Sequence, residues 1–322
     1  MAMRVLLTGA FGAIGYRVVE ALLAAGHEVV AFDVDTPANR RAARDFAGRI
    51  TVRWGDITDA AGVADAMRGA GAVIHNAAII PPRTDANPAL AERVNVGGTR
   101  NVLAAIRQCA PMPRLVFPSS VSVHGHHLPD APAPLRITDP VRAEDAYAGH
   151  KIQCEQLIEQ SGVDWVIVRI GACLEGRRAG STDTDLLRLM FTIAPQCRIE
   201  WVHPKDVATA MVNALATPDA GGRKFFLGGG AACQTTWRDF TSLAIDALGC
   251  GPLPVEAFGT QGYYTDWMDT ADAERLLHFQ HHTLEDYRAE LTRQFQWIRP
   301  LLLPFRGLVR RYLLSYSTTP RA

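Results

Sequence analysis

The amino-acid sequence predicts an α/β fold organised around a doubly wound parallel sheet, with a smaller C-terminal region beside it. Three observations lead to this prediction. Residues 4–23 read as a strand, a glycine-rich turn and a helix; strand and helix patterns then alternate as far as Arg169; and beyond Arg169 the alternation stops. Strands that alternate with helices indicate parallel strands joined by right-handed crossovers.

The first strand and the turn after it form the best defined unit. The apolar run 5–7 ends at Thr8, the stretch from Gly9 to Gly15 reads GAFGAIG, and a helical apolar pattern follows. Glycines at Gly9, Gly12 and Gly15 let the chain turn sharply, let a pyrophosphate approach the backbone and let the helix pack on the strand. The helix then points free N–H groups at the phosphates. This unit predicts a Rossmann-like dinucleotide site.

A second strand, predicted over 29–32, ends in Asp33. The spacing of about 18 residues from Gly15 is near the one at which an acidic residue binds the adenosine ribose hydroxyls. Arg40 and Arg41 follow and would suit a 2′-phosphate, but the carboxylate of Asp33 would repel that group. The pattern therefore favours NAD over NADP.

The remaining elements follow in the order that a doubly wound sheet requires. Further strands are predicted over 50–54, 72–75, 115–117 and 165–169, with helices over 60–67, 90–106 and 148–158. A doubly wound sheet binds its ligand at the carboxyl ends of its strands. The loops after these strands should therefore converge on one site.

Beyond Arg169 the chain is predicted to leave the sheet and to return to it once. A helix over 204–216 and a strand over 224–227 precede two helical stretches over 271–277 and 284–295. We expect a Rossmann domain and a smaller substrate-binding lid, followed by a tail. The domain comprises 1–172 with 204–228 returning to it, the lid comprises 173–203 and 229–296, and the tail comprises 297–322.

Composition restricts the partners and the compartment. The 33 basic residues balance the 33 acidic residues, so no bulk field favours nucleic acid. The six cysteines lie far apart without a C-x-x-C pair, and no secretory leader precedes the first strand, which predicts a cytoplasmic protein with reduced thiols. No apolar run reaches the ~18 residues of a membrane span. His124, His126 and His127 lack the partner spacing of a metal site, so no metal is expected. His150, His281 and His282 are most simply interpreted as surface residues.

The tail, from Trp297 to Tyr316, combines leucines and aromatic side chains with four arginines. This composition suits a helix lying in a membrane interface. Packing on the chain's own domain or on a partner subunit is the simpler interpretation. Pro300, Pro304 and Gly307 argue against one long helix.

A second pattern concerns proton transfer. Tyr147 and Lys151 are four residues apart at the start of a predicted helix and share one face, with Ser119 and Ser120 about 27 residues upstream. A phenol titrates near pH 10, and a cation at about 4 Å in an effective dielectric of ~20 lowers its pKa by roughly three units. Lys151, helped by a positive nicotinamide ring, is therefore expected to bring the pKa of Tyr147 near 7, where general acid–base catalysis works best.

Seven motifs occur in an order that resembles one family. They are TGAFGAIG from Thr8, GDITD from Gly55, HNAA from His75, VNVGGTRNVL from Val94, SSVSVHG from Ser119, YAGHK from Tyr147 and WVHPKDVA from Trp201. Together they resemble the extended short-chain dehydrogenase/reductase superfamily, in its NAD-dependent epimerase/dehydratase family, over almost the whole chain. The resemblance implies NAD as the cofactor and a homodimer formed through the helices at 90–106 and 148–158.

The resemblance also implies roles for individual residues. Tyr147 would be the catalytic acid and base, Lys151 would lower its pKa and hold the nicotinamide ribose, and Ser120 would bind the reacting oxygen. Asp33 would bind the adenosine ribose, and Asp56 with its neighbour would flank the adenine. The residues implied in cofactor binding are Gly9, Phe11, Gly12, Ala13, Ile14, Gly15, Asp33, Asp56, Ile57, Ala77, Asn95, Tyr147 and Lys151.

Departures from the family pattern concern the substrate. Family members that dehydrate nucleotide sugars have a Thr-Asp-Glu triplet where this chain has Ser120-Val121-Ser122, which removes the extra acid and base. After Arg169 the chain reads IGACLEG in place of P-x-N-x-Y-G, so a standard UDP-sugar pocket is not expected. The residues expected to touch a substrate are Ser122, His124 and Cys173.

These observations predict reversible hydride transfer between NAD and a secondary alcohol or ketone carbon, with Ser120, Tyr147 and Lys151 as the catalytic residues. The partner is a small molecule with a hydroxyl or carbonyl group. A sugar or nucleotide-sugar epimerase that retains its NAD would use the same residues. A non-catalytic NAD-binding sensor or scaffold is the alternative from another class, since a fold does not determine a function.

Overall fold

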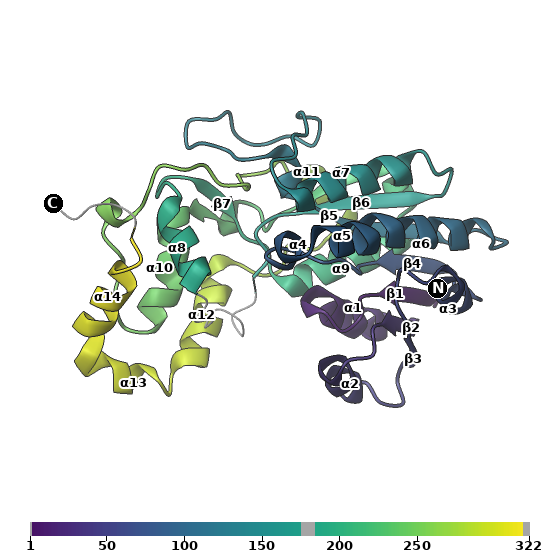
Figure 1. Cartoon of the computed structure of the whole chain (residues 1–322), viewed down its shortest axis with the longest axis horizontal. Helices are drawn as coiled ribbons and strands as arrows, with labels where there is room; N and C mark the ends of the chain where they lie inside the picture. Colours follow the sequence, from purple (N-terminus) through teal and green to yellow (C-terminus); the bar gives the residue numbers. More distant parts are fainter. Residues whose placement is uncertain (1, 175–183, 318–322) are drawn as a thin grey trace.

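A computed structural model describes residues 2–174 and 184–317. Within these residues the main sheet has seven parallel strands in the order β3-β2-β1-β4-β5-β6-β8. Figure 1 shows this sheet with helices on both faces. The strands are β1 (Arg4–Thr8), β2 (Glu28–Asp33), β3 (Thr51–Trp54), β4 (Ala72–His75), β5 (Arg114–Ser120), β6 (Trp165–Ile170) and β8 (Arg223–Leu227). The predicted doubly wound α/β fold is confirmed.

The two faces of the sheet bury separate hydrophobic layers. In β1, Val5 and Leu7 belong to one layer and Leu6 to the other, as the alternation of side chains along a strand requires. The first layer is covered by α1 (Ala13–Ala24) and α9 (Pro204–Ala216), which pack against each other. The second is covered by α3 (Ala60–Met67), α6 (Gly98–Arg107) and α7 (Ala146–Glu159). The further helices of this half are α2 (Pro37–Arg44), α4 (Arg83–Ala86), α5 (Pro88–Glu92), η2 (Val121–His124) and α11 (Ala271–Leu277).

The strand order reverses at β1, which has β2 on one side and β4 on the other. Thr8, the last residue of β1, is in register with Phe32 and His75, the residues near the ends of those neighbours. A ligand crevice opens at such a switch point, outside the carboxyl ends of the strands. The fold therefore places the glycine turn at the edge where a ligand enters.

The helix predicted over 90–106 is divided into three parts. Between α5 and α6 the residues Arg93–Gly97 form a single π-helical turn, η1. In this turn the Asn95 side chain accepts a hydrogen bond from the Ile79 N–H and donates one to the Ile79 carbonyl. A π turn admits an extra residue into the helix, and it lies where Asn95 fastens the helix to the loop after β4.

The C-terminal region has a second small sheet and its own core. Strand β7 (Arg198–Glu200) pairs antiparallel with β9 (Gln234–Thr236), and Trp201, Phe240 and Tyr287 lie among the core residues. The helices here are α8 (Thr184–Thr192), η5 (Ala231–Cys233), α10 (Trp237–Ala247), η6 (Val255–Ala257), α12 (Leu284–Phe295), α13 (Arg299–Leu302), η7 (Leu303–Phe305) and α14 (Arg306–Leu314), whereas η4 (Pro218–Ala220) lies between α9 and β8 and packs with the main sheet. Figure 1 shows α12, α13 and α14 gathered at the end of the molecule away from β1, β2 and β3.

The chain returns to the main sheet as the sequence predicts, because β8 pairs with β6 and α9 packs on α1. Parts of the predicted lid and tail, 175–183 and 318–322, lie outside the described residues. Among the residues that are described, no helix combines the length and the apolar content that a membrane span needs.

Candidate active site

The glycine turn after β1 depends on positions where a side chain does not fit. Gly9 has φ +66°, and a Cβ on it would lie 2.8 Å from the main chain of Ala77. A Cβ on Gly15 would lie 2.0 Å from the Gly9 carbonyl oxygen. Gly12 precedes α1 without a side-chain cap, so no side chain covers the N–H groups of the first turn, which begins with Ala13 and Ile14. The turn therefore presents bare main chain at the helix N-terminus.

Asp33 fastens this turn to the end of β2. Its carboxylate accepts the N–H of Phe11 and the N–H of Val34, both at 2.8 Å, and the Asn39 side-chain amide at 3.1 Å. Burial raises the pKa of Asp33, whereas the N–H groups of Phe11 and Val34 lower it. Asp33, the residue predicted to bind the adenosine ribose, thus lies directly beside the glycine turn.

The other predicted cofactor residues lie on the neighbouring loops. Asp56 accepts hydrogen bonds from the N–H and hydroxyl of Thr58, at 2.9 and 2.8 Å, in the loop after β3. Ile57 is buried and its carbonyl accepts the Asn101 side chain at 2.9 Å, so the side chain of Ile57 belongs to the core. The N–H of Ala77 binds the Thr8 hydroxyl at 3.2 Å, after β4. Both loops, after β3 and after β4, lie at the same edge of the sheet as the glycine turn.

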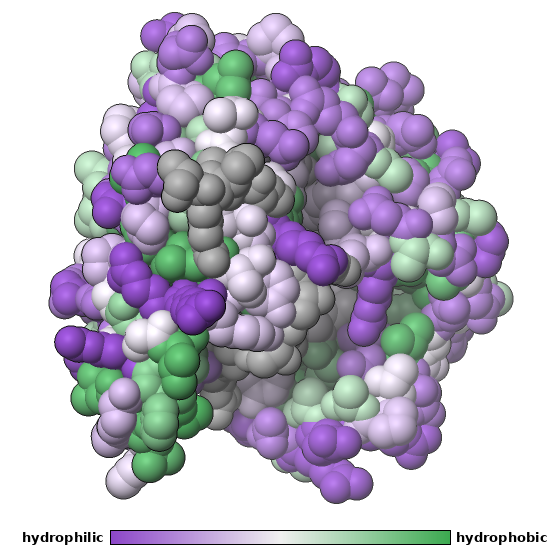
Figure 2. Space-filling model, turned by 60° about the vertical axis from the view of Figure 1, so that its left-hand side comes forward, coloured by the Kyte–Doolittle hydropathy of each residue, from purple (hydrophilic) through white to green (hydrophobic). Residues whose placement is uncertain are grey.

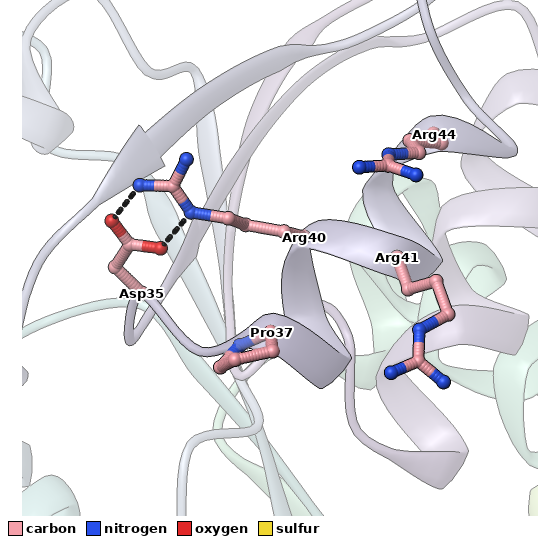
Figure 3. A pocket seen from close by; sticks show the side chains of 5 residues that line it. All are labelled: Asp35, Pro37, Arg40, Arg41 and Arg44. Carbon is pink, nitrogen blue, oxygen red and sulfur yellow. Dashed lines mark hydrogen bonds and ion pairs between the residues drawn. The ribbon is translucent and has the colours of Figure 1, made fainter.

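A surface hollow of about 480 Å³ lies next to this edge and is lined by Asp35, Pro37, Arg40, Arg41 and Arg44. Figure 3 shows the Arg40 guanidinium turned onto the Asp35 carboxylate, with two hydrogen bonds of 2.5 Å. Arg40 and Arg41 are the two arginines that the sequence suggests for binding a 2′-phosphate. The charge of Arg40 is neutralised by Asp35. The contact agrees with the preference for NAD.

The three predicted catalytic residues come together where β5 meets α7. Asp145 caps α7 by accepting the Ala148 N–H at 2.7 Å, which places Tyr147 in the first turn of the helix. The hydroxyl of Ser120, the last residue of β5, lies next to the Tyr147 phenol. The Lys151 ammonium lies 5.7 Å from the centre of the Tyr147 ring.

The expected lowering of the Tyr147 pKa by Lys151 is not produced by the chain's own groups. Burial, followed by the Asp145 carboxylate, raises the pKa of Tyr147 above its ordinary value, and the neighbouring Ser120 hydroxyl lowers it by less. The Lys151 ammonium instead donates to the Pro118 carbonyl at 2.6 Å and lies 4.5 Å above the Phe117 ring. Burial lowers the pKa of Lys151 to about 8.

A buried polar network supports the end of β5 from behind. The Ser119 hydroxyl donates to Glu155 at 2.6 Å, and Arg169 donates two hydrogen bonds to the same carboxylate at 3.1 and 2.7 Å. Lys224 adds a second cation, with its ammonium 3.2 Å from the Glu155 carboxylate. Burial raises the pKa of Glu155, but the hydrogen bond and charge of Arg169 outweigh it and leave this pKa below its usual range. Ser119 precedes Ser120, the residue predicted to bind the reacting oxygen of the substrate. The network therefore holds the end of β5 in place.

The residues predicted to touch a substrate are engaged within the chain. The Ser122 hydroxyl donates to the Ser120 hydroxyl oxygen at 2.9 Å. The His124 ring is buried between Arg169, at 2.8 Å, and the Pro140 carbonyl, at 3.2 Å. Burial and the charge of Arg169 lower the pKa of His124 to about 4. Cys173 is half-buried and packs against the core. Substrate contact by these three residues stays a prediction.

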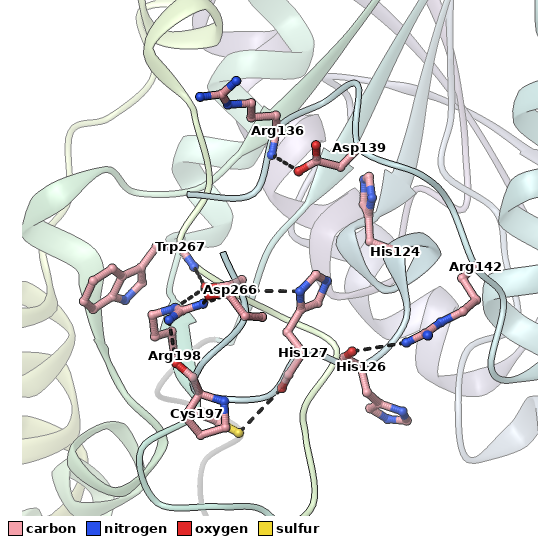
Figure 4. A network of polar contacts seen from close by, with 12 residues as sticks. His124, His126, His127, Arg136, Asp139, Arg142, Cys197, Arg198, Asp266 and Trp267 are labelled. Atoms are coloured by element: carbon pink, nitrogen blue, oxygen red, sulfur yellow. Dashed lines mark hydrogen bonds and ion pairs between the residues drawn. The ribbon is translucent and has the colours of Figure 1, made fainter. Parts of the chain in front are cut away.

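The three neighbouring histidines take different directions (Figure 4). His126 pairs with Glu144, and His127 lies 3.6 Å from Asp266, whereas His124 faces Arg169. In the part of the chain that the structure describes, no three His, Cys, Asp or Glu side chains are grouped as metal ligands.

Figure 4 also shows how the loop after η2 is fastened to the C-terminal region. Arg198 of β7 donates to Asp266 at 2.6 and 2.9 Å and to the carbonyls of Pro129 and Ala131 at 2.7 and 2.6 Å. The loop that follows Ser120 is therefore held by residues far along the chain.

The sequence does not predict the positions of two residues near the site, Tyr264 and His150. The Tyr264 ring lies against the His126 ring, with the ring centres 5.1 Å apart and the planes tilted by 38°. Burial, and after it the charge of Asp145, raises the pKa of both Tyr264 and Tyr147. Nothing in the sequence around Tyr264 indicates this position. His150, whose simplest interpretation is a surface residue, is buried, with Nδ1 at 3.4 Å from the Asn95 amide, because its position on α7 faces η1.

The sheet order, the glycine turn and the corner formed by β5 and α7 define the extended short-chain dehydrogenase/reductase class. A family model described as the NAD dependent epimerase/dehydratase family matches residues 5–228. The chain belongs to this NAD-dependent family.

Curated relatives differ in how much of their length this chain covers. An uncharacterized protein of Mycobacterium tuberculosis is 30% identical over 215 residues, which are 66% of this chain and 20% of that protein. The 3 beta-hydroxysteroid dehydrogenase/Delta 5-->4-isomerase of the same species is 37% identical over 175 residues, 51% of this chain and 44% of that protein. The D-erythronate dehydrogenase of Cupriavidus necator is 32% identical over 241 residues, 66% of this chain and 72% of that protein. The chain thus spans about a fifth of the first relative and less than half of the second.

Solved structures share the architecture over nearly the whole chain. The dTDP-glucose 4,6-dehydratase DesIV of Streptomyces venezuelae, solved with NAD, is 25% identical with a TM-score of 0.76 and covers 93% of this chain and 98% of its own. The UDP-glucuronic acid 4-epimerase of Bacillus cereus is 20% identical with a TM-score of 0.75 and covers 93% of this chain and 100% of its own. The second likeness concerns the fold alone.

Proposed function

We propose that this protein is an NAD-dependent oxidoreductase that transfers a hydride at a secondary alcohol or ketone carbon. One observation carries the proposal. The Tyr147 phenol lies next to the Ser120 hydroxyl at the carboxyl end of β5, and Lys151 follows one helical turn later on α7. A proton donor and an oxygen-binding hydroxyl thus stand at the sheet edge where the glycine turn opens.

The residues at the glycine turn fit NAD. Bare main chain at Gly9 and Gly15, and the uncapped start of α1 after Gly12, suit a pyrophosphate that binds N–H groups. The Asp33 carboxylate, already beside Phe11, suits the adenosine ribose hydroxyls. When bound, NAD accepts or supplies the hydride through its nicotinamide ring.

The proton is assigned to Tyr147. Burial keeps its phenol protonated in the chain alone, as a donor to a carbonyl oxygen requires. Ser120 accepts hydrogen bonds from the N–H and hydroxyl of Ser122, at 3.2 and 2.9 Å, so its own O–H is directed to the phenol or to a substrate oxygen. In the oxidative direction Tyr147 takes the hydroxyl proton, and the positive charges of Lys151 and of oxidised NAD favour the phenolate.

For the substrate we propose a small molecule with a hydroxyl or carbonyl group, bound between the sheet edge and a lid formed by 173–203 and 229–296. Dehydration is not proposed because Ser120-Val121-Ser122 carries no acid. The names of two curated relatives, a hydroxysteroid dehydrogenase and an erythronate dehydrogenase, support net oxidation or reduction.

The assembly and the compartment are part of the same proposal. The homodimer that the resemblance implies would use α6 and α7, which pack side by side on one face of the sheet. We propose a cytoplasmic location because the six cysteines lie far apart in the sequence without a C-x-x-C pair. Sedimentation of the full chain tests the dimer.

A substitution at Tyr147 tests the proposed chemistry. The full chain is assayed with NAD and a panel of secondary alcohols, and with NADH and the matching ketones. Tyr147→Phe should lower turnover by about 10²- to 10⁴-fold, the usual contribution of general acid–base catalysis, while the Kd for NAD changes little. Tyr312→Phe, at an exposed phenol in α14, is the matched control and should keep full turnover. Unchanged turnover of Tyr147→Phe would contradict the assignment.

A further inference from the structure

The C-terminal segment 297–312 concentrates exposed apolar side chains. Of the sixteen large apolar side chains that are exposed among the described residues, seven lie in this segment. Five of them follow one another at helical spacing and are named here the tail face: Trp297, Leu301, Phe305, Leu308 and Tyr312, with exposed fractions of 80%, 71%, 57%, 65% and 57%. Figure 2, which brings this end of the molecule forward, shows apolar surface gathered at the lower left.

The tail face is held outward by contacts on the opposite side of α14. Val309, Leu313 and Leu314 pack against the core of the C-terminal region. The Arg310 guanidinium donates to the Pro252 carbonyl at 2.7 Å. Because α14 packs one side against the core, Leu308 and Tyr312, the two tail-face residues on this helix, are held on its exposed side.

The C-terminal segment itself carries charge of one sign. No acidic residue follows Glu290 in the sequence. Arg293, Arg299, Arg306 and Arg311 are all exposed. The whole chain carries no net charge, so this local excess of positive charge is specific to the C-terminal segment.

We propose that the tail face docks on the surface of an anionic lipid bilayer. Exposed Trp, Phe and Leu side chains enter the boundary between headgroups and acyl chains, and arginines at their edge bind lipid phosphates. The contact is peripheral, since none of the described helices spans a bilayer. It brings the proposed oxidoreductase, whose site is formed by other residues, to a membrane surface.

A second copy of the chain suits this face less well than an anionic surface does. A two-fold symmetric contact brings each patch against an identical patch. The exposed arginines of one copy would then face the same arginines of its partner, and like charges repel. An anionic bilayer instead pairs every arginine with an opposite charge.

Vesicle flotation with the full chain tests the docking. Two vesicle types are compared, phosphatidylcholine alone and phosphatidylcholine with about a third phosphatidylserine. The chain should bind the anionic vesicles at least about tenfold more tightly, and added salt should weaken this binding. Arg306→Gln with Arg311→Gln should weaken it by roughly fivefold for each arginine removed.

The apolar part is tested by a matched pair of triple variants. Trp297→Ser, Leu301→Ser and Leu308→Ser together should reduce vesicle binding at least about tenfold. The control, Met112→Ser with Leu128→Ser and Val141→Ser, removes three exposed apolar side chains elsewhere and should bind like the parent chain. Each variant must keep its affinity for NAD, which separates loss of docking from loss of folding.

Three results would overturn the docking proposal. These are no binding to either vesicle, equal binding to both, or unchanged binding by the tail-face variant. A dimer that the tail-face serine variant converts to monomer, without vesicle binding by the parent, would assign the face to a second copy instead. Turnover is measured in parallel, so failure of docking and failure of the proposed oxidoreductase are distinguished.

Discussion

The carboxyl edge of the main sheet and the tail face use their side chains in opposite ways. At the sheet edge, polar groups such as Asp33, Glu155 and Lys151 are withdrawn from water and bound to partners in the chain. On the tail face, apolar groups such as Trp297 and Leu308 are exposed. The first arrangement suits a ligand that enters the molecule, and the second suits a surface that the molecule meets.

Two arginine–carboxylate pairs extend the comparison to stability. Arg169 binds Glu155 behind the catalytic corner, with both side chains 3% exposed. Arg198 binds Asp266 in the C-terminal region, where the arginine side chain is 14% exposed. Removing one member of a buried pair leaves an uncompensated charge, and its cost grows with burial.

The largest stability effect is therefore expected for Arg169→Met. It should lower the free energy of unfolding by about 3–5 kcal/mol, because Glu155 loses both hydrogen bonds from the guanidinium. Arg198→Met should cost less, since water reaches that pair more easily. Urea unfolding of both variants measures the difference. Equal losses in the free energy of unfolding for Arg169→Met and Arg198→Met would contradict the prediction. So would a double variant, Arg169→Met with Glu155→Met, that is no more stable than Arg169→Met alone.

A second prediction separates the two roles expected of the glycine turn, which are close packing of the helix on the strand and binding of NAD. Gly15→Ala should lower the free energy of unfolding by about 3 kcal/mol and abolish NAD binding, because the new Cβ meets the Gly9 carbonyl at 2.0 Å. Gly12→Ala should retain most of the stability, since its Cβ lies 3.5 Å from the same oxygen, but should weaken NAD binding.

Thermal unfolding and NAD titration check both glycine variants. Gly97→Ala is the control, because nothing lies within 4 Å of its added Cβ, and it should retain stability and NAD affinity. A Gly15→Ala protein with full stability would show that the turn relaxes and that its packing is not needed.

A third, smaller effect concerns pH. His124 is buried in its neutral form with a pKa of about 4, whereas an unfolded histidine titrates near 6.5. Between pH 4 and pH 6.5 the unfolded chain therefore binds more protons at His124 than the folded chain does. The contribution of His124 to the free energy of unfolding is present above pH 6.5 and is lost as the pH falls toward 4. From pH 7 to pH 5 the loss from this residue is about 2 kcal/mol.

Unfolding by urea at several pH values measures this slope. His124→Gln should be less stable at pH 7, but its stability should fall by about 2 kcal/mol less between pH 7 and pH 5. Ser122→Ala, a neighbouring change without a titratable group, should keep the parent slope. An unchanged slope in His124→Gln would show that the ring is not held neutral.

The main sheet and the glycine turn could be predicted because both follow from local pattern. The apolar runs of β1, β2 and β4 are short and bounded, and Gly9 and Gly15 stand where any Cβ would collide with main chain. Asp33 lies beside the turn because it ends the strand next to β1. In each case the residues belong to a strand–turn–helix unit or to the strand beside it, a pattern that the sequence displays.

The rest could not be predicted because it depends on contacts between distant residues. The π turn at Asn95 depends on Ile79, and the place of Tyr264 depends on how the C-terminal region meets the loop after Ser120. Helical spacing indicated that Tyr147 and Lys151 share a face. It did not indicate that the ammonium turns to the Pro118 carbonyl.

The central claim, net hydride transfer with an exchangeable cofactor, is tested most directly by identifying what the purified protein carries. The full chain, purified without added cofactor, is analysed by absorbance and mass spectrometry before and after denaturation. A dehydrogenase or reductase should release little NAD on denaturation and should bind added NAD reversibly. Stoichiometric NAD that leaves only on denaturation would contradict the claim and indicate an epimerase that retains its cofactor.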